Sequence, residues 1–139
     1  MIRIERHLDD RGELEQVLPL PIMKTKRAYI TTNRKGVVRG FHGHQRENKA
    51  IFVIEGTIKV LVFSMENVSQ PSKMFKFTLS ESMPQALYIP RGNYHGYSAL
   101  SEKSRVLIYS DKSLEESQKD DYRLNPFTFG SGIWEVEAR

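Results

Sequence analysis

Short segments rich in β-forming residues follow one another through the middle of the chain, and turn residues separate them. They span residues 27–32, 37–42, 50–55, 57–63, 74–79, 86–89 and 104–110. Gly56 and the run Pro90-Arg91-Gly92-Asn93 are turn signals between these segments. Helical periodicity is almost absent, and strands at this spacing without alternating helices indicate an all-β sandwich or double-sheet barrel.

Three further elements are expected. The 50–55 and 57–63 segments are separated by Gly56 alone and are predicted to pair as a hairpin. Residues 114–121 are polar and are predicted to form one or two helical turns. The apolar, glycine-punctuated ending is predicted to fold back over the barrel, with Trp134 as a packing residue.

The length and composition limit the classes of protein. With 139 residues, the chain is expected to form one domain over residues 1–139. It has no apolar run of 18 residues and its start lacks a secretory pattern, so a cytoplasmic protein without a membrane partner is expected. The absence of cysteine excludes disulfides, thiolate ligands and a cysteine nucleophile. The net charge of +4 suits an anionic metabolite, but the basic residues are scattered and no nucleic-acid motif is present.

Three of the four histidines lie in two short motifs. His42 and His44 are two residues apart, so in a strand their side chains share one face. His95 follows Pro90 and Gly92 in the pattern P-x-G-x-x-H. In this order the two motifs resemble those of the cupins, which are all-β double-sheet barrels of the jelly-roll type. The resemblance implies that fold for this chain, with the histidines inside the barrel.

Lys49 departs from the cupin pattern. Seven residues before Gly56, where cupins carry a glutamate that binds a metal, this chain has a lysine. An ammonium group repels a divalent cation, so a metal is disfavoured and no cofactor is expected. A site of three histidines, or one using Glu47, stays an alternative. Without a metal, a histidine and a lysine suit removal of a proton beside a carbonyl, because imidazole takes the proton and the ammonium stabilises the enolate.

A closer resemblance covers nearly the whole chain. The run Lys35-Gly36-Val37-Val38-Arg39-Gly40-Phe41-His42 resembles the K-G-V-L-R-G-L-H signature of the dTDP-4-dehydrorhamnose 3,5-epimerase family. Leu87-Tyr88-Ile89-Pro90-Arg91-Gly92-Asn93-Tyr94-His95-Gly96-Tyr97, followed by Leu100-Ser101-Glu102, is similar to that family's L-Y-I-P-x-G-x-x-H-G-F and L-S-E run. By resemblance, His42 is the general base, Lys49 stabilises the enolate and Arg39 contacts the nucleotide diphosphate.

The acid implied by the resemblance is a tyrosine on the strand after L-S-E. A strict count places it at Ile108, and the tyrosine of this chain is Tyr109, one residue later. Tyr109 is predicted as the acid, on the condition that the turn at Lys103-Ser104 holds one extra residue. The family's acidic partner of the base precedes a proline, where this chain has Asn125, and Asp120 or Asp121 is a candidate substitute.

The run Gly43-His44-Gln45 and the short chain instead resemble the dTDP-sugar 3,4-ketoisomerases, whereas Lys49 and the ending favour the epimerases. The predicted function is therefore an isomerase that removes the C3 proton of a nucleotide-linked 4-keto-6-deoxyhexose, as a 3,5- or C3-epimerase. A 3,4-ketoisomerase, a sugar-binding cupin without turnover and a metal-dependent cupin are the alternatives. The predicted partner is a nucleotide-diphosphate sugar, and the resemblance implies a homodimer.

The predicted site has two groups of residues. The catalytic group is His42, Lys49 and Tyr109, and the substrate-binding group is Arg27, Arg39, His44 and His95.

Overall fold

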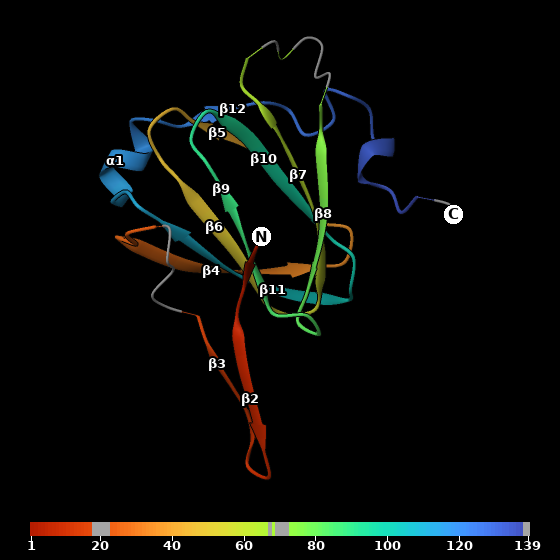
Figure 1. Cartoon of the computed structure of the whole chain (residues 1–139). Helices are drawn as coiled ribbons and strands as arrows, with labels where there is room; N and C mark the ends of the chain where they lie inside the picture. The colour runs from red at the N-terminus through yellow and green to blue at the C-terminus, as the bar shows by residue number, and fades with distance from the viewer. Residues whose placement is uncertain (18–22, 67, 69–72, 138–139) are drawn as a thin grey trace.

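The computed structural model describes residues 1–17, 23–66, 68 and 73–137 (Figure 1). Within these ranges the regular secondary structure is almost entirely β-strand, with one short α-helix and one 3-10 helix. The elements are β1 (Ile2–Arg3), β2 (Glu5–Asp9), β3 (Gly12–Gln16), β4 (Arg27–Arg34), β5 (Val38–His44), β6 (Lys49–Glu55), β7 (Thr57–Ser64), β8 (Phe75–Ser80), β9 (Gln85–Ile89), β10 (Asn93–Ala99), β11 (Lys103–Ser110), α1 (Leu114–Gln118), β12 (Tyr122–Arg123) and η1 (Gly132–Trp134). Neither helix in this part of the chain is long and apolar enough to cross a membrane.

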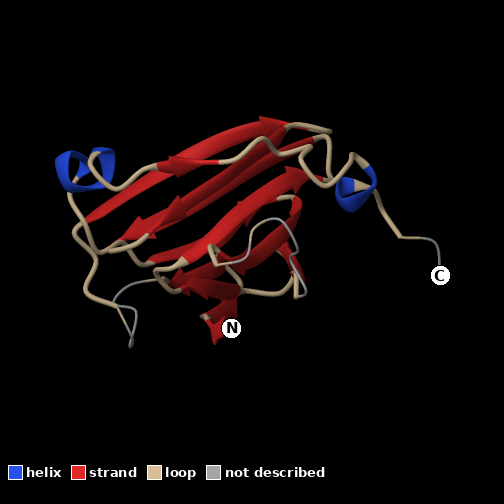
Figure 2. Cartoon of the chain, turned by 90° about the horizontal axis from the view of Figure 1, so that it is seen from above, coloured by secondary structure: helices blue, strands red, loops and turns tan. Residues whose placement is uncertain are grey.

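Two five-stranded antiparallel sheets form the body of the molecule. The first sheet has the order β1-β9-β6-β11-β4 and the second has the order β12-β5-β10-β7-β8. From β4 to β12 the chain changes sheet at every connection except that between β7 and β8. Figure 2 shows the resulting layers of strands. The arrangement confirms the double-sheet jelly roll that the sequence predicts.

The main apolar core lies between the two sheets. Val53 and Ile108 contribute to it from the first sheet, and Val60, Leu79 and Tyr97 contribute from the second. All five side chains are buried. Because side chains alternate along a strand, this cluster fixes which residues of each strand face the interior of the barrel.

The outer face of each sheet is also partly covered. On the first sheet, Ile4 packs over Phe52 of β6 and Tyr109 of β11. On the second sheet, the C-terminal segment folds back as predicted, and the Trp134 ring stacks on Phe41 with centroids 5.2 Å apart. The Trp134 indole N–H donates a hydrogen bond to the carbonyl of Pro126 at 2.8 Å. These contacts confirm the prediction that Trp134 is a packing residue.

The predicted hairpin at Gly56 is wrong. The strand β6 pairs with β9 and β11, whereas β7 pairs with β8 and β10, so the chain passes from one sheet to the other at this glycine. Gly56 has a φ of 84°, and a Cβ atom there would lie 2.3 Å from the carbonyl oxygen of Lys103. A single residue is too short for a two-residue hairpin turn, and the glycine instead permits a sharp turn against the β11 backbone.

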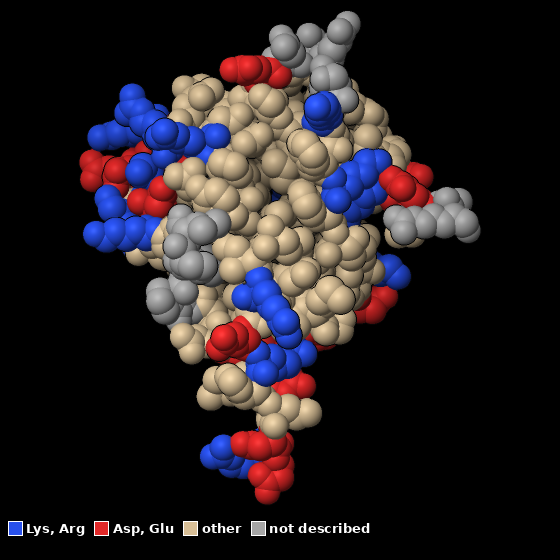
Figure 3. Space-filling view, viewed as in Figure 1, with Lys and Arg blue, Asp and Glu red and all other residues tan. Residues whose placement is uncertain are grey.

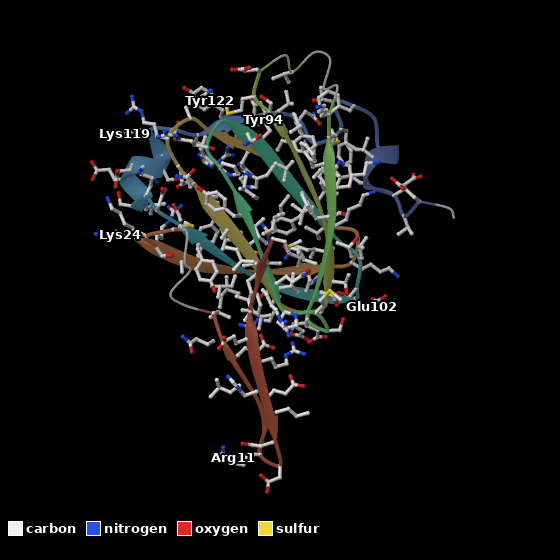
Figure 4. All side chains as sticks on the ribbon, in the orientation of Figure 1. Arg11, Lys24, Tyr94, Glu102, Lys119 and Tyr122 are labelled. Atoms are coloured by element: carbon white, nitrogen blue, oxygen red, sulfur yellow. The ribbon has the colours of Figure 1, made fainter. Side chains whose placement is uncertain are left out.

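The strands β2 and β3 form a hairpin that the sequence analysis missed, and it extends away from the barrel (Figure 1). Arg11 lies at its tip in Figure 4, and acidic and basic side chains are mixed there in Figure 3. Leu8 and Leu14 are 75% and 61% exposed on this hairpin. The hairpin therefore places apolar side chains outside the barrel.

Two glycines with almost the same φ allow a matched test of the turn at Gly56. Gly92 has a φ of 85°, and a Cβ atom added there would have no neighbour within 4 Å, so Gly92→Ala should lower the free energy of unfolding by only about 1–2 kcal/mol. Gly56→Ala adds a backbone clash and should cost about 3 kcal/mol or more. Urea unfolding of both variants measures the difference, and equal losses would contradict the close approach of β11.

Candidate active site

A cavity of about 650 Å³ lies inside the barrel, between the two sheets and beside α1. The first sheet contributes Tyr29 and Lys49, and the second contributes His42 and Tyr97. The residues that line the cavity are Arg27, Ala28, Tyr29, Thr31, Arg39, His42, His44, Lys49, His95, Tyr97, Ile108, Leu114, Ser117, Gln118, Asp121 and Arg123. The lining is therefore apolar in part, but basic and imidazole groups dominate its polar side chains.

The cavity brings together six of the seven predicted site residues. Strand alternation explains two of the pairs, because Arg27 shares a face with Tyr29, and His42 shares a face with His44. Arg39 needs a different explanation, since it is three residues from His42 and a regular strand would point it to the opposite face. The pairing of β5 with β10 shifts register between His95 and Tyr97, and this bulge returns Arg39 to the cavity.

His42 has the environment of a general base. Its side chain is 37% exposed, so a ligand in the cavity can reach it. Its Nδ1 atom lies 3.8 Å from Oδ1 of Asp121, which leaves Nε2 for a ligand. Burial and then the charge of Lys49 lower the pKa of His42, while Asp121 opposes the shift. The imidazole is therefore neutral and able to accept a proton at neutral pH.

The two candidate aspartates have different positions. Asp121 directly precedes β12, which pairs with β5 in the register Arg123 to His42, and so it lies beside the His42 ring. Its other oxygen accepts a hydrogen bond from Arg123 Nε at 3.0 Å. The carboxylate of Asp120 instead accepts hydrogen bonds from the backbone N–H groups of residues 45, 46 and 47. Asp121 is therefore the acidic neighbour of His42, and Asp120 holds the loop after β5.

Glu47 is a fully buried carboxylate that contacts residues of the cavity wall, and from the sequence it was only a candidate metal ligand. It accepts hydrogen bonds from the hydroxyl of Ser110 at 2.9 Å and from Arg27 Nη2 at 3.4 Å. Its Oε2 lies 3.5 Å from Lys49 Nζ and 3.4 Å from His44 Nε2. The carboxylate compensates the buried Lys49 and the half-buried Arg27, which would otherwise be costly to hold inside the barrel.

The register of β11 with β4 and β6 explains why these side chains lie around Glu47. Ser110 of β11 lies opposite Arg27 of β4 on one side and opposite Lys49 of β6 on the other. The three side chains form one row across the first sheet, and all three approach Glu47. The signal in the sequence was the spacing of two between Glu47 and Lys49, although Glu47 lies in the loop before β6, which begins at Lys49.

Lys49 contributes an ammonium group to the cavity wall. Its side chain is 9% exposed, and Nζ donates a hydrogen bond to the hydroxyl of Tyr29 at 3.1 Å. Nζ also lies 5.7 Å from the centroid of the Tyr29 ring. The ammonium is held between Glu47 and Tyr29 in a position where it can stabilise negative charge that develops on a ligand.

His44 and His95 complete the imidazole wall. Their ring centroids are 6.1 Å apart, and the His95 ring is 6.3 Å from that of His42. The Nδ1 atom of His44 lies 2.6 Å from the carbonyl oxygen of Asp120, which requires a proton on Nδ1. Burial lowers the pKa of both residues, and that of His95 falls well below 6.5. Both rings are therefore neutral, and His44 is engaged in a backbone contact.

The structure does not place Tyr109 in the cavity, and the prediction that it lies in the site is corrected. β11 pairs with β4 in unbroken register, so the turn before it holds no extra residue and Ile108 faces the cavity. Tyr109 points to the outer face, where its hydroxyl donates a hydrogen bond to the carbonyl of Val17 at 3.3 Å. Burial raises its pKa to about 12.

Within the described ranges no group of three or more His, Asp or Glu side chains is arranged to hold a metal ion. The three histidine rings are spread along the wall, and the Lys49 ammonium occupies the position at which cupins carry the glutamate ligand. The donor set therefore does not fit a divalent cation.

The double-sheet barrel thus holds an imidazole beside a carboxylate, with a lysine in the facing wall, and these groups suit proton transfer beside a carbonyl. The profile of the family described as dTDP-4-dehydrorhamnose 3,5-epimerase matches residues 2–131 of the chain. The chain belongs to this family, which confirms the resemblance drawn from the sequence and the class of activity expected from it.

Three known proteins are similar to this chain in sequence or in fold. The spore coat polysaccharide biosynthesis protein SpsL of Bacillus subtilis (strain 168) is 27% identical over 144 aligned positions, which cover 99% of this chain and 95% of that protein. The structure of NovW, a 4-keto-6-deoxy sugar epimerase from Streptomyces spheroides, has a TM-score of 0.82 and 18% identity, covering 96% of this chain and 73% of that chain. A 3,4-ketoisomerase of Thermoanaerobacterium thermosaccharolyticum in complex with TDP has a TM-score of 0.74 and 22% identity, covering 88% and 85%. The two structures show that the fold is shared.

The role of Glu47 as compensating charge can be measured. Glu47→Gln leaves Lys49 and Arg27 without a buried anion, so the free energy of unfolding should fall by about 3 kcal/mol. Glu55→Gln is the matched control, because Glu55 pairs with Lys103 at 3.8 Å on the surface and its loss should cost about 0–1 kcal/mol. Urea unfolding measures both, and similar small losses would contradict the compensating role.

Proposed function

We propose that this chain epimerises a nucleotide-linked 4-keto-6-deoxyhexose by removing the proton at C3, without a cofactor. The observation that carries the proposal is the position of His42, which is neutral, reachable and beside Asp121, in a wall that faces Lys49. Base and cation belong to different sheets, so a sugar ring between them meets both at once. We propose that this active site is formed by one cupin domain over residues 1–139.

The proposed reaction uses each group for one task. Nε2 of His42 takes the C3 proton, and the carboxylate of Asp121 stabilises the imidazolium that forms. Loss of this proton moves negative charge onto the C4 oxygen of the sugar. Lys49 stabilises that enolate oxygen, and Glu47 and Tyr29 hold the ammonium in place.

The charge of the cavity supports a nucleotide-diphosphate sugar as the substrate. Three guanidinium groups line it, from Arg27, Arg39 and Arg123. Arg39 is held by the side chain of Asn33, whose Oδ1 accepts a hydrogen bond from Arg39 Nε. Guanidinium groups bind phosphate oxygens with two parallel hydrogen bonds, and we assign the diphosphate to Arg39.

The 3,4-ketoisomerase and the sugar-binding cupin are the competing functions. His44 is the residue that favours the ketoisomerase from sequence, but its Nδ1 is engaged by the carbonyl of Asp120 and its Nε2 lies beside Glu47. Nε2 of His42 is left free for a ligand, and this position of the base supports epimerisation instead. A binding protein without turnover would keep the cavity and show no proton exchange, so isotope exchange separates it from an enzyme.

A homodimer is part of the proposal. The exposed Leu8 and Leu14 of the β2–β3 hairpin lie outside the barrel, where a second copy would bury apolar area. Cytoplasmic location stays a prediction from the sequence. Light scattering of the purified protein measures its mass, and a monomer at micromolar concentration would contradict the dimer.

Proton exchange tests the enzymatic proposal directly. In deuterated water, the protein should introduce deuterium at C3 of dTDP-4-keto-6-deoxyglucose, and His42→Ala should slow this by about 100-fold or more. Lys103→Ala is the control, because Lys103 pairs with Glu55 on the surface and does not line the cavity, so this variant should exchange at the normal rate. NMR of the recovered sugar reports the label and identifies an epimer or a 3-keto product. Absence of deuterium at C3 in every 4-keto-6-deoxy sugar that binds would contradict the enzymatic proposal.

The pH profile tests the pairing of His42 with Asp121. The base must be neutral, and burial lowers its pKa, so kcat/KM should be level at neutral pH and fall only below about pH 6.5. Asp121→Asn removes the charge that opposes this shift. The acid limb should therefore move to still lower pH while kcat falls. An acid limb that stays in place would show that Asp121 does not act on His42.

A further inference from the structure

The cavity contains a phenol that the sequence analysis did not assign to the site. Tyr29 of β4 lies directly opposite Ile108 of β11, the position at which the family resemblance places its acid. Like Arg27 and Thr31, Tyr29 faces the interior, and it lines the cavity. The chain therefore retains a phenol at the row of Ile108, but the neighbouring strand supplies it.

The hydrogen bonding of Tyr29 leaves its own proton available. An ammonium group can only donate, so the Tyr29 hydroxyl accepts the bond from Lys49 Nζ at 3.1 Å. No hydrogen bond donated by the Tyr29 hydroxyl is found among residues 1–17, 23–66, 68 and 73–137. Tyr97, the other tyrosine of the cavity wall, is engaged instead, because its hydroxyl lies 2.6 Å from Thr31 Oγ1.

Tyr29 and His42 lie in opposite walls. Tyr29 belongs to the first sheet, together with Lys49, and His42 belongs to the second sheet, together with His95. A sugar ring held between the sheets presents one face to the imidazole and the other face to the phenol. A proton removed on one face and returned on the other inverts the carbon atom.

We propose that Tyr29 is the general acid of this enzyme and returns a proton to C3 on the face opposite His42, which makes the reaction an inversion at C3. This proposal rests on the proposed function. It predicts a stereochemical outcome, because a 3,4-ketoisomerase has no need of a proton donor at C3 on the second face.

The steps balance without a further reactant. The C3–H bond breaks, the proton goes to His42 Nε2, and the electron pair forms the enolate with its charge on the C4 oxygen near Lys49. The O–H bond of Tyr29 then breaks while a new C3–H bond forms on the other face and the C4 carbonyl is restored. His42 releases its proton to water and the phenolate of Tyr29 takes one from water.

Tyr29→Phe separates proton removal from proton return, since the variant keeps the aromatic ring and loses only the hydroxyl. In deuterated water, His42 should still exchange the C3 proton, so the recovered starting sugar should carry deuterium at a rate within about threefold of normal. Formation of the C3 epimer should fall by about 100-fold or more. NMR of the same samples reports both rates.

Tyr109→Phe is the matched control, because that hydroxyl lies outside the cavity and its loss should leave both rates unchanged. Normal epimer formation by Tyr29→Phe, with exchange by the unmodified protein, would overturn the role of Tyr29 and leave the proposed function standing. Loss of both exchange and epimer in this variant would also overturn it, since the hydroxyl would then be needed to position Lys49 for proton removal. Absence of exchange in the unmodified protein would overturn the proposed function itself.

Discussion

The site depends on the buried carboxylate of Glu47. Lys49 and Arg27 are drawn into the barrel from two strands of one sheet, and an unpaired cation there would be strongly destabilising. Glu47 compensates both, and the hydroxyl of Ser110 between them adds a hydrogen bond. The negative charge also limits how far the lysine can move. A polar cavity can therefore exist beside the apolar core that lies between the two sheets.

The second wall depends on backbone geometry more than on charge. A bulge in the pairing of β5 with β10 lets Arg39 and His42 face the same cavity. Asp120 then holds the loop after β5 by accepting three backbone hydrogen bonds, and the next residue, Asp121, is left beside the His42 ring. Neighbouring aspartates thus have separate tasks, one for the loop and one for the base.

The two walls of the cavity present different chemical groups to a ligand. His42 and Asp121 act from one side, and Lys49 with Tyr29 acts from the other. Burial lowers the pKa of the His42 imidazole, and the facing Lys49 ammonium lies 3.5 Å from Glu47. A base and a cation on opposite sides of one ligand favour formation of an enolate, and they do so without a metal ion.

The sequence by itself determined the strand pattern, the family and six of the residues that line the cavity, because two histidine motifs and Lys49 have spacings that alternation converts into shared faces. It did not reveal the sheet change at Gly56, the bulge that turns Arg39 inward or the position of Asp121, since each depends on pairing between distant strands. Tyr109 shows the limit most clearly. A shift of one residue reverses the face of a side chain, and only the register of β11 with β4 decided that Ile108 faces the cavity and that Tyr29 lies beside it.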